Sequence, residues 1–137
     1  MSLFNIFDVA SSGLRAQNVR LNLTASNLAN VNSIVGNKAD AYRSRHPVFS
    51  VVLDQMGTAS GVGGVKTTKI VESRAEPDAR YFPGHPLADD KGYIYSSNVS
   101  AVDEMTDMIS ASRSYQLNVE LMTASKKLVE KTLTLGQ

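Results

Sequence analysis

Apolar residues near the start of the chain recur at a fixed spacing. The repeat is seven residues for Phe7, Leu14, Leu21 and Leu28, and the residues that fall three or four positions away are Ala10, Ala25 and Val31. This spacing predicts one helix from about Ile6 to Val31, with Asn5 as its N-cap and Asp8 in its first turn. A stripe this narrow is typical of a coiled-coil seam rather than of a globular core face.

Residues 99–137 show the strongest helical pattern in the chain. They contain no Pro, and their first Gly is Gly136, while Ser100 with Asp103 resembles a capping box at the start. Acidic residues open this predicted helix and three lysines lie toward its end, at positions 126, 127 and 131. Both groups of charges complement the helix dipole.

Two apolar stripes run along this second helix. The first contains Met105, Met108, Tyr115, Val119, Met122, Val129 and Leu133, and the second contains Leu117, Leu121, Ala124, Leu128 and Leu135. At about 3.6 residues per turn the two stripes lie on nearly opposite faces. A pair of helices can cover only one of them, so we expect Leu14, Leu21 and Leu28 to meet the first stripe and neighbouring subunits to meet the second.

The middle segment, residues 34–98, has a different pattern and contains all four prolines. Residues 48–53, 65–71 and 93–95 read as β-strands, and glycines 57, 61, 63 and 64 read as a loose connection between the first two. Residues 76–86 read as an ordered extended loop. The chain therefore divides into residues 1–33, 34–98 and 99–137, which predicts an α+β fold. Long N- and C-terminal helices pair as an antiparallel coiled coil, with a small β-rich module inserted between them.

The length of the second helix argues against a compact monomer. A helix over residues 99–135 would span about 55 Å, whereas a globule of this size has a diameter of roughly 35 to 40 Å. We therefore expect a rod-shaped subunit that is completed by copies or relatives of itself. Repeated contacts of this kind build helical filaments when they do not close into a ring.

Composition excludes several classes of partner and location. The 14 Lys and Arg residues balance 13 Asp and Glu residues, which argues against a nucleic-acid binder. The absence of Cys excludes disulfides and Cys-based zinc sites. No apolar run is long enough for a membrane span or for the core of a signal peptide.

The sequence offers no convincing catalytic or binding constellation. His46 and His85 both precede proline and have no partner at metal-binding spacing. The glycines at 61–64 lack the phosphate-loop pattern, and Asp89 with Asp90 reads as part of a turn. We therefore expect no enzyme activity, cofactor, metal ion or small-molecule substrate.

Two terminal motifs resemble those of bacterial flagellar axial proteins, the rod and hook subunits. Residues 25–33 read ASNLANVNS, in which the motif positions are Asn27, Leu28, Ala29, Asn30 and Asn32. Residues 104–118 read EMTDMISASRSYQLN, in which the motif positions are Arg113, Tyr115 and Asn118. The middle of the chain narrows the resemblance to proximal rod subunits of the basal body, through Pro77-Asp78, residues 83–89 (PGHPLAD) and Lys91-Gly92-Tyr93. The chain departs from that pattern at Ala41 and Ser97, where proline is common.

The resemblance implies a structural subunit of the proximal rod, which transmits torque from motor to hook and contains the export channel. It implies assembly with copies of itself and other rod proteins, and export by the flagellar type III apparatus without a cleaved signal peptide. The subunit would then reside in the periplasm-spanning rod. The low charge and six asparagines of residues 1–33 agree with this, because amides can satisfy one another at a crowded interface without the desolvation cost of ions. The alternative is a non-polymerising two-helix adaptor or secretion chaperone.

Overall fold

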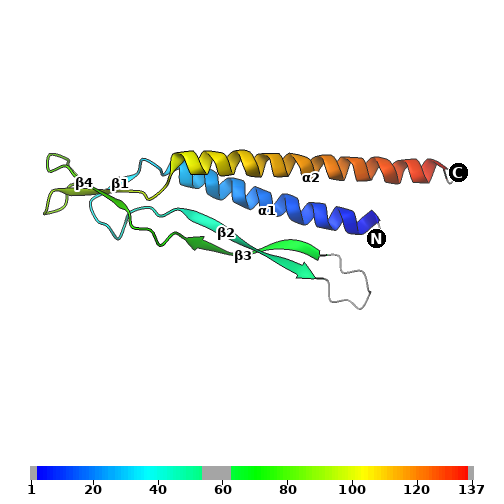
Figure 1. The fold of residues 1–137 in the computed structure, drawn as a ribbon, viewed down its shortest axis with the longest axis horizontal. Helices are drawn as coiled ribbons and strands as arrows, with labels where there is room; N and C mark the ends of the chain where they lie inside the picture. Colours follow the sequence, from blue (N-terminus) through cyan, green and yellow to red (C-terminus); the bar gives the residue numbers. More distant parts are fainter. Residues whose placement is uncertain (1–2, 54–62, 136–137) are drawn as a thin grey trace.

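Two long helices dominate the molecule. A computed structural model of the chain describes residues 3–53 and 63–135. Helix α1 spans Leu3–Ala29 and helix α2 spans Ala101–Leu135. The helices run antiparallel and side by side, and α2 extends beyond the start of α1 (Figure 1). At about 1.5 Å per residue, the 35 residues of α2 span about 52 Å.

Among the described residues between the helices, five strands form two separate antiparallel sheets. Strands β2, Arg45–Leu53, and β3, Gly63–Glu72, form a long hairpin. The other sheet has the order β1-β5-β4, with β1 at Ile34–Val35, β4 at Asp78–Tyr81 and β5 at Tyr93–Ser96. This smaller sheet lies beyond the end of the helix pair, at the opposite end from the two termini (Figure 1).

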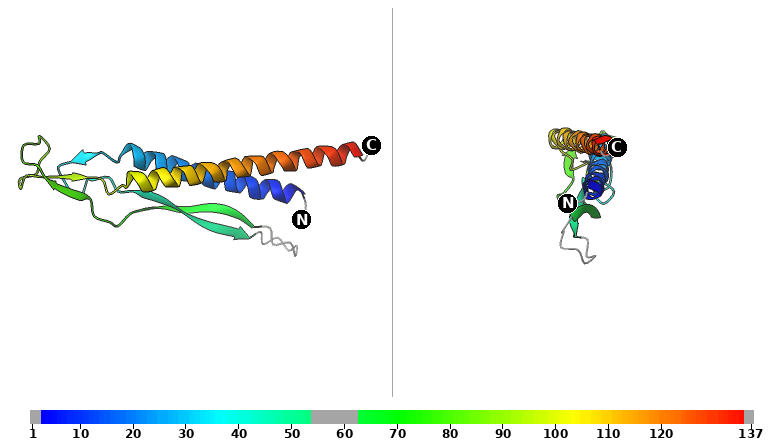
Figure 2. Two further views of the ribbon diagram at one scale, coloured as in Figure 1. Left: turned by 45° about the horizontal axis from the view of Figure 1, so that its top comes forward. Right: turned by 90° about the vertical axis from the view of Figure 1, so that its right-hand side faces the viewer.

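The long hairpin lies along α1 on the side away from α2. Contacts join α1 to both β2 and β3, so α1 is the middle layer of three (Figure 2). The molecule is elongated, because the long axes of all three layers are aligned. The prediction of a rod-shaped subunit agrees with this shape.

The interior is made mainly of small and polar side chains. The buried apolar residues are Ala10, Ala16, Ala41, Ile94 and Ala111. The buried polar residues are Ser12, Thr24, Asn27, Ser44, Ser97, Glu104 and Ser125. Among the residues whose burial is described, Ile94 is the only large aliphatic side chain in the interior. Hydrogen bonds and close backbone approach therefore do more to define this fold than a large apolar core does.

The expected elements are present, with corrections at their ends. Helix α1 begins at Leu3, so the predictions of Asn5 as N-cap and Asp8 in the first turn are wrong. At α2, the Asp103 amide donates to Ser100 Oγ at 3.4 Å, as one half of a capping box.

The β-module also differs in detail. Strand β4 lies in the segment predicted as an extended loop, and the two-residue strand β1 was not predicted. Gly63 and Gly64 belong to β3 rather than to a loose connection, while Gly57 and Gly61 fall outside the described residues.

Candidate subunit interface

The surface between α1 and α2 is a seam of small and polar residues. Three antiparallel contacts fix its register: Gly13 against Asn118, Arg20 with Asp107, and Asn27 with Glu104. Further buried residues continue the seam: Thr24 on α1 and Ala111 on α2 lie between these contacts, and Ala10 and Ser125 lie beyond the contact of Gly13 with Asn118. A Cβ on Gly13 would lie 3.1 Å from Asn118 Nδ2, so the helices approach closely at that point. We call these residues the α1–α2 seam.

The large apolar residues near this seam are only partly buried. Leu14, Leu21 and Leu28 are half-buried, as are Met108, Tyr115, Met122 and Val129. The prediction that α1 covers the whole first stripe is wrong for Met105, Val119 and Leu133, which are 51%, 41% and 67% exposed. The reason is that close approach at Gly13 and the polar pairs set the rotation of α2, and this rotation turns Met105 and Val119 away from α1.

Asn27 joins three parts of the fold at the end of the helix pair nearest the small sheet. Its Nδ2 donates to the Arg45 carbonyl oxygen at 3.0 Å and to Glu104 Oε1 at 2.9 Å. Its Oδ1 accepts from the Arg45 amide and from the Tyr42 hydroxyl, each at 2.9 Å. The Asn27 side chain is 0% exposed; its bond to Glu104 is buried, and its bonds to Arg45 and Tyr42 are partly buried. We call Asn27, Tyr42, Arg45 and Glu104 the Asn27 junction.

Glu104 enters this junction as a buried acid. It is 4% exposed, and its second oxygen, Oε2, is buried without a hydrogen-bond partner among the described residues. Burial raises the pKa of Glu104 above its ordinary value of 4.5, against the opposing effects of the Asn27 hydrogen bond and the charge of His46. The carboxyl group therefore binds a proton more readily in the folded chain than in the unfolded chain.

Ser12 attaches the long hairpin to α1. Its hydroxyl donates to the Val9 carbonyl at 2.7 Å and accepts from the Val65 amide at 3.0 Å. A Cβ on Gly64 would lie 3.2 Å from Ser12 Oγ, so the start of β3 also approaches α1 closely. The Ser12 hydroxyl therefore holds the start of β3 close to α1.

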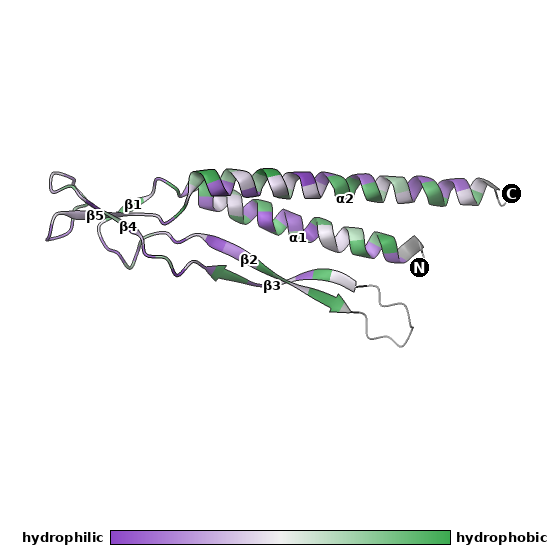
Figure 3. Ribbon diagram, in the orientation of Figure 1, coloured by the Kyte–Doolittle hydropathy of each residue, from purple (hydrophilic) through white to green (hydrophobic). Residues whose placement is uncertain are grey.

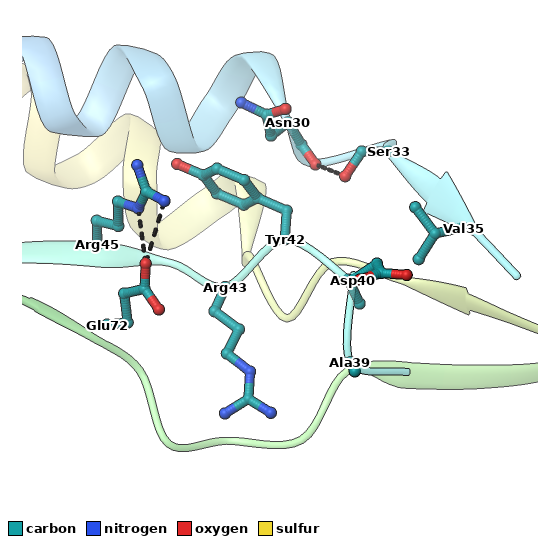
Figure 4. A pocket seen from close by; sticks show the side chains of 10 residues that line it. Asn30, Ser33, Val35, Ala39, Asp40, Tyr42, Arg43, Arg45 and Glu72 are labelled. Carbon is teal, nitrogen blue, oxygen red and sulfur yellow. Dashed lines mark hydrogen bonds and ion pairs between the residues drawn. The ribbon is translucent and has the colours of Figure 1, made fainter. Parts of the chain in front are cut away.

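A cavity of about 440 Å³ lies where the end of α1 meets the start of β2. Arg45 and Glu72 form an ion pair in its wall at 3.1 Å, and the Arg45 guanidinium lies 5.6 Å from the centre of the Tyr42 ring. Figure 4 shows the side chain of Arg43 pointing away from this pair. The charges of Arg45 and Glu72 neutralise each other, so we assign this cavity a structural role.

The outward surface of α2 carries two groups of exposed apolar residues. Patch A consists of Val102, Met105 and Ile109, which are 73%, 51% and 57% exposed. Patch B consists of Leu117, Leu121 and Leu128, which are 65%, 48% and 57% exposed. Hydrophobic and hydrophilic residues alternate along the whole of α2 (Figure 3). Within the part of the chain that the structure describes, no helix is both long and apolar enough to cross a membrane.

The residues considered for chemistry have structural partners. His85 Nδ1 accepts from the Leu87 amide at 3.1 Å, and His46 Nε2 lies 3.3 Å from Ser44 Oγ. Asp89 accepts from the Lys91 and Tyr93 amides and from the Tyr95 hydroxyl, which assigns it to the turn before β5. The Tyr93 amide is the main cause that lowers the Asp89 pKa. Over residues 3–53 and 63–135, no group of three or more His, Asp or Glu side chains could hold a metal ion.

Comparison with known proteins identifies the family. Residues 7–36 match the family described as flagella basal body rod protein, and residues 90–135 match the C-terminal region described for flagellar basal body rod FlgEFG proteins. The flagellar basal-body rod proteins FlgC of Escherichia coli O157:H7 and of Yersinia enterocolitica are each 49% identical to this chain. FlgC of Salmonella typhimurium strain LT2 is 47% identical. All three alignments cover 100% of both chains. The chain belongs to the FlgC family of flagellar basal-body rod proteins.

The N-terminal motif of this rod protein lies at the end of α1. Asn27 is the centre of the junction described above, and Leu28 is half-buried beside it. Asn30 Nδ2 donates to the Ser26 carbonyl at 2.9 Å and so helps to end the helix. Ala29 and Asn32 are exposed.

The C-terminal motif of the rod protein lies in the first half of α2. Tyr115 and Asn118 are half-buried, Asn118 against Gly13, while Arg113 is exposed. The resemblance seen in the sequence is confirmed by the full-length relatives. Sequence reasoning missed the roles of Ser12 and Glu104, because a single serine or glutamate on a helix gives no periodic signal.

Proposed function

We propose that the chain is a structural subunit of the rod of the bacterial flagellar basal body, where it assembles with copies of itself and with other rod proteins. The observation that carries this proposal is full-length identity of 47–49% to flagellar basal-body rod proteins named FlgC. The elongated shape supports it, because three parallel layers can transmit force along their common axis. Exposed apolar residues on α2 support it further, since patches of this kind mark interaction sites.

The proposal places the subunit in the proximal, periplasm-spanning part of the rod. In it, α1 and α2 form an antiparallel coiled coil in the wall of a torque-transmitting tube that contains the export channel. The three- and four-residue spacing of the seam supports the coiled coil, because its α1 residues at 10, 13, 20, 24 and 27 follow this spacing together with Gln17, whose side-chain oxygen is also buried. Export through the flagellar type III apparatus without a cleaved signal peptide belongs to the same proposal.

The proposal involves two sets of packing residues, one within each chain and one between subunits. Within one chain, we place the half-buried Leu14, Leu21 and Leu28 of α1 against the half-buried Met108, Tyr115 and Met122 of α2. The exposed residues Leu117, Leu121 and Leu128, together with Met105 and Val119, are left for neighbouring subunits. Burial of these side chains during assembly would stabilise the rod by removing apolar surface from water.

A charge at Leu121 tests the proposal. In cells that lack the native gene, the Leu121→Asp subunit should be made and remain soluble, but it should be absent from purified basal bodies, and the cells should not swim. Asn22→Asp is the control, because Asn22 is exposed on α1 and makes one exposed hydrogen bond, to Asn18. Normal rods and motility with Leu121→Asp would refute the assignment of that face. A saturable complex of fixed stoichiometry with one partner, and no chain in the rod, would favour the adaptor or chaperone instead.

A further inference from the structure

The two strands of the long hairpin exchange places beside α1. Where β2 begins, the amide and the carbonyl oxygen of Arg45 bond to the Asn27 side chain, so the outer edge of β2 faces α1 there. Near the start of β3, the Val65 amide donates to Ser12 Oγ, so at that level the outer edge of β3 faces α1 instead. Figure 1 shows the two strands crossing between these points. Helix α1 therefore covers only part of each edge of the hairpin.

The uncovered part of the β2 edge lies level with Val65. In an antiparallel pair, the amide and carbonyl of one residue point together, toward the partner strand or away from it, and the two directions alternate along the strand. Val51 pairs with Val65, whose amide points away from β2. The main-chain groups of Val51 therefore point away from β3, as do those of Phe49, two residues earlier. Among the described helices and strands, only α1 and β3 lie against β2, so we call residues 49–51 the open β2 edge.

The uncovered part of the β3 edge lies at the other end of the hairpin. Arg45 pairs with Glu72, and the main-chain groups of Arg45 point to Asn27. Those of Glu72 therefore point away from β2, as do those of Ile70. Of the described helices and strands, only α1 and β2 lie against β3, and at this level α1 is on the β2 side. We call residues 70–72 the open β3 edge.

The open edges have little protection against the addition of another strand. Proteins usually protect an exposed edge with charges, prolines or bulges. Pro47 and a register shift after Val48 interrupt the β2 edge, but residues 49–53 contain neither proline nor charge. Val51 and Ile70, one on each open edge, are 70% and 53% exposed, the highest values among the large apolar residues of the hairpin whose burial is described. An added strand would satisfy the outward main-chain groups and cover these side chains.

A second copy of the chain supplies a strand with the required direction. Strands β2 and β3 are antiparallel, so in two subunits of the same orientation the open β2 edge of one is antiparallel to the open β3 edge of the other. With Val51 opposite Ile70 and Phe49 opposite Glu72, each pair can exchange its amide–carbonyl hydrogen bonds. The side chains of Val51 and Ile70 then lie side by side on one face of the joined sheet.

This register also fixes how the two subunits are related. Within one chain Ile70 pairs with Pro47, so pairing with Val51 of a neighbour displaces the two hairpins by four residues, about 13 Å. The contact joins two different surfaces, and its repetition builds an open assembly rather than a closed dimer. Two free proteins need about 800 Å² of buried surface on each partner, more than two short edges supply. The contact therefore forms within an assembly, where many repeats reinforce one another.

We infer that the hairpins of neighbouring subunits join edge to edge, with the open β2 edge of one copy paired to the open β3 edge of the next. This inference rests on the proposed function, because it requires subunits of the same orientation within one assembly. It gives the hairpin a function of its own, which is to connect subunits through main-chain hydrogen bonds.

Disulfide formation tests the pairing directly, because the chain contains no cysteine. Subunits with Val51→Cys, Ile70→Cys or both are expressed in place of the native chain, and purified basal bodies are oxidised. Residues paired in this way have Cα atoms about 5.5 Å apart, which a disulfide can bridge. Within one chain Val51 pairs with Val65, five residues from Ile70, which is too far. The double variant should give dimers and longer ladders, and each single variant should give monomers only.

Val51→Cys with Lys69→Cys is the matched control. Lys69 is exposed and adjacent to Ile70, but successive side chains of a strand project from opposite faces of the sheet. This double variant should therefore remain monomeric after oxidation.

Two results would overturn the inference while leaving the proposed function intact. One is the absence of disulfides between positions 51 and 70 in rods that contain the double variant, including rods in which a strand of another protein covers the open β2 edge. The other is a dimer from either single variant, which would indicate a symmetric contact. Absence of even the unsubstituted chain from basal bodies would instead overturn the proposed function, and the inference with it.

A proline keeps the test decisive where the cysteine variants do not assemble. Val51→Pro removes an amide that points away from β3, so the hydrogen bonds within the hairpin remain and the circular dichroism of the subunit should be unchanged. Its incorporation into rods should fall at least about tenfold, because a carbonyl of the neighbour loses its donor. Val51→Thr keeps the amide and the branched side chain and should be incorporated normally. Equal incorporation of the two variants would overturn the pairing.

Discussion

Replacing Asn27 with alanine removes the centre of the Asn27 junction. Its amide makes four hydrogen bonds, to both backbone groups of Arg45, to the Tyr42 hydroxyl and to Glu104 Oε1. These bonds connect the end of α1 to the start of β2 and to the first turns of α2. Asn27→Ala should therefore loosen all three connections at once.

The magnitude follows from the partners that lose a bond. Three bonds join neutral groups at about 1 kcal/mol each, and the bond to the Glu104 carboxylate contributes about 1.5 to 3 kcal/mol. Alanine offsets about 0.6 kcal/mol through its better helix propensity, and water can reach part of the vacated space near the exposed Arg45. We expect the free energy of unfolding to fall by about 3 to 5 kcal/mol.

Urea unfolding of the purified subunit, followed by the circular dichroism of its helices, measures this loss. With a slope of about 1 to 3 kcal/mol per molar urea, the midpoint should fall by roughly 1 to 5 M. Asn22→Ala is the matched control, because Asn22 lies on the same helix and makes one exposed bond to Asn18. It should change stability by less than about 0.5 kcal/mol. A loss below about 1 kcal/mol for Asn27→Ala, or equal losses for both variants, would refute the importance of the junction.

Three further predictions concern other parts of the fold. Because burial raises the pKa of Glu104 in the folded chain, stability should fall as pH rises from 4.5 through that raised pKa, and Glu104→Gln should flatten this part of a stability profile measured by urea unfolding. Gly92 has φ +78°, and a Cβ there would lie 3.0 Å from the Tyr81 ring. Gly92→Ala should therefore lower the free energy of unfolding, measured by thermal unfolding, by at least about 1 to 2 kcal/mol. Gly84→Ala is the control and should be near neutral, because a Cβ there would have nothing within 4 Å. Arg20 and Asp107 form a partly exposed ion pair at 2.6 Å. A double-mutant cycle should show a coupling energy of about 0.5 to 1 kcal/mol between them, and this coupling should shrink in 1 M salt. A coupling of zero at low salt would contradict the role of the pair in the seam.

The sequence predicted the helices and the long hairpin well. Their signals are strong because apolar spacing persists over many residues, as in α2, or because β-branched residues gather in two runs, as in β2 and β3. Strands β1 and β4 were not predicted from the sequence. Strand β1 has only two residues, and β4, with the sequence DARY, has no alternation of apolar and polar residues.

The packing of the helices was predicted less well, for a physical reason. Hydrophobic periodicity locates leucine and methionine, but the α1–α2 seam is built from alanine, glycine and polar side chains such as Asn27 and Glu104. These residues set which face of α2 meets α1, and so decide which apolar residues remain exposed. The useful signal in the sequence was the abundance of asparagine on a helix with little charge.

The central claim is that this chain is a structural subunit of the flagellar rod, and a density map of intact basal bodies tests it most directly. At a resolution that separates helices and large side chains, the account predicts α1 and α2 of this chain in the rod wall, with Leu117, Leu121 and Leu128 in contact with a neighbouring subunit. Rods whose density holds no copy of this chain would contradict the claim. So would copies in which all three leucines face open space.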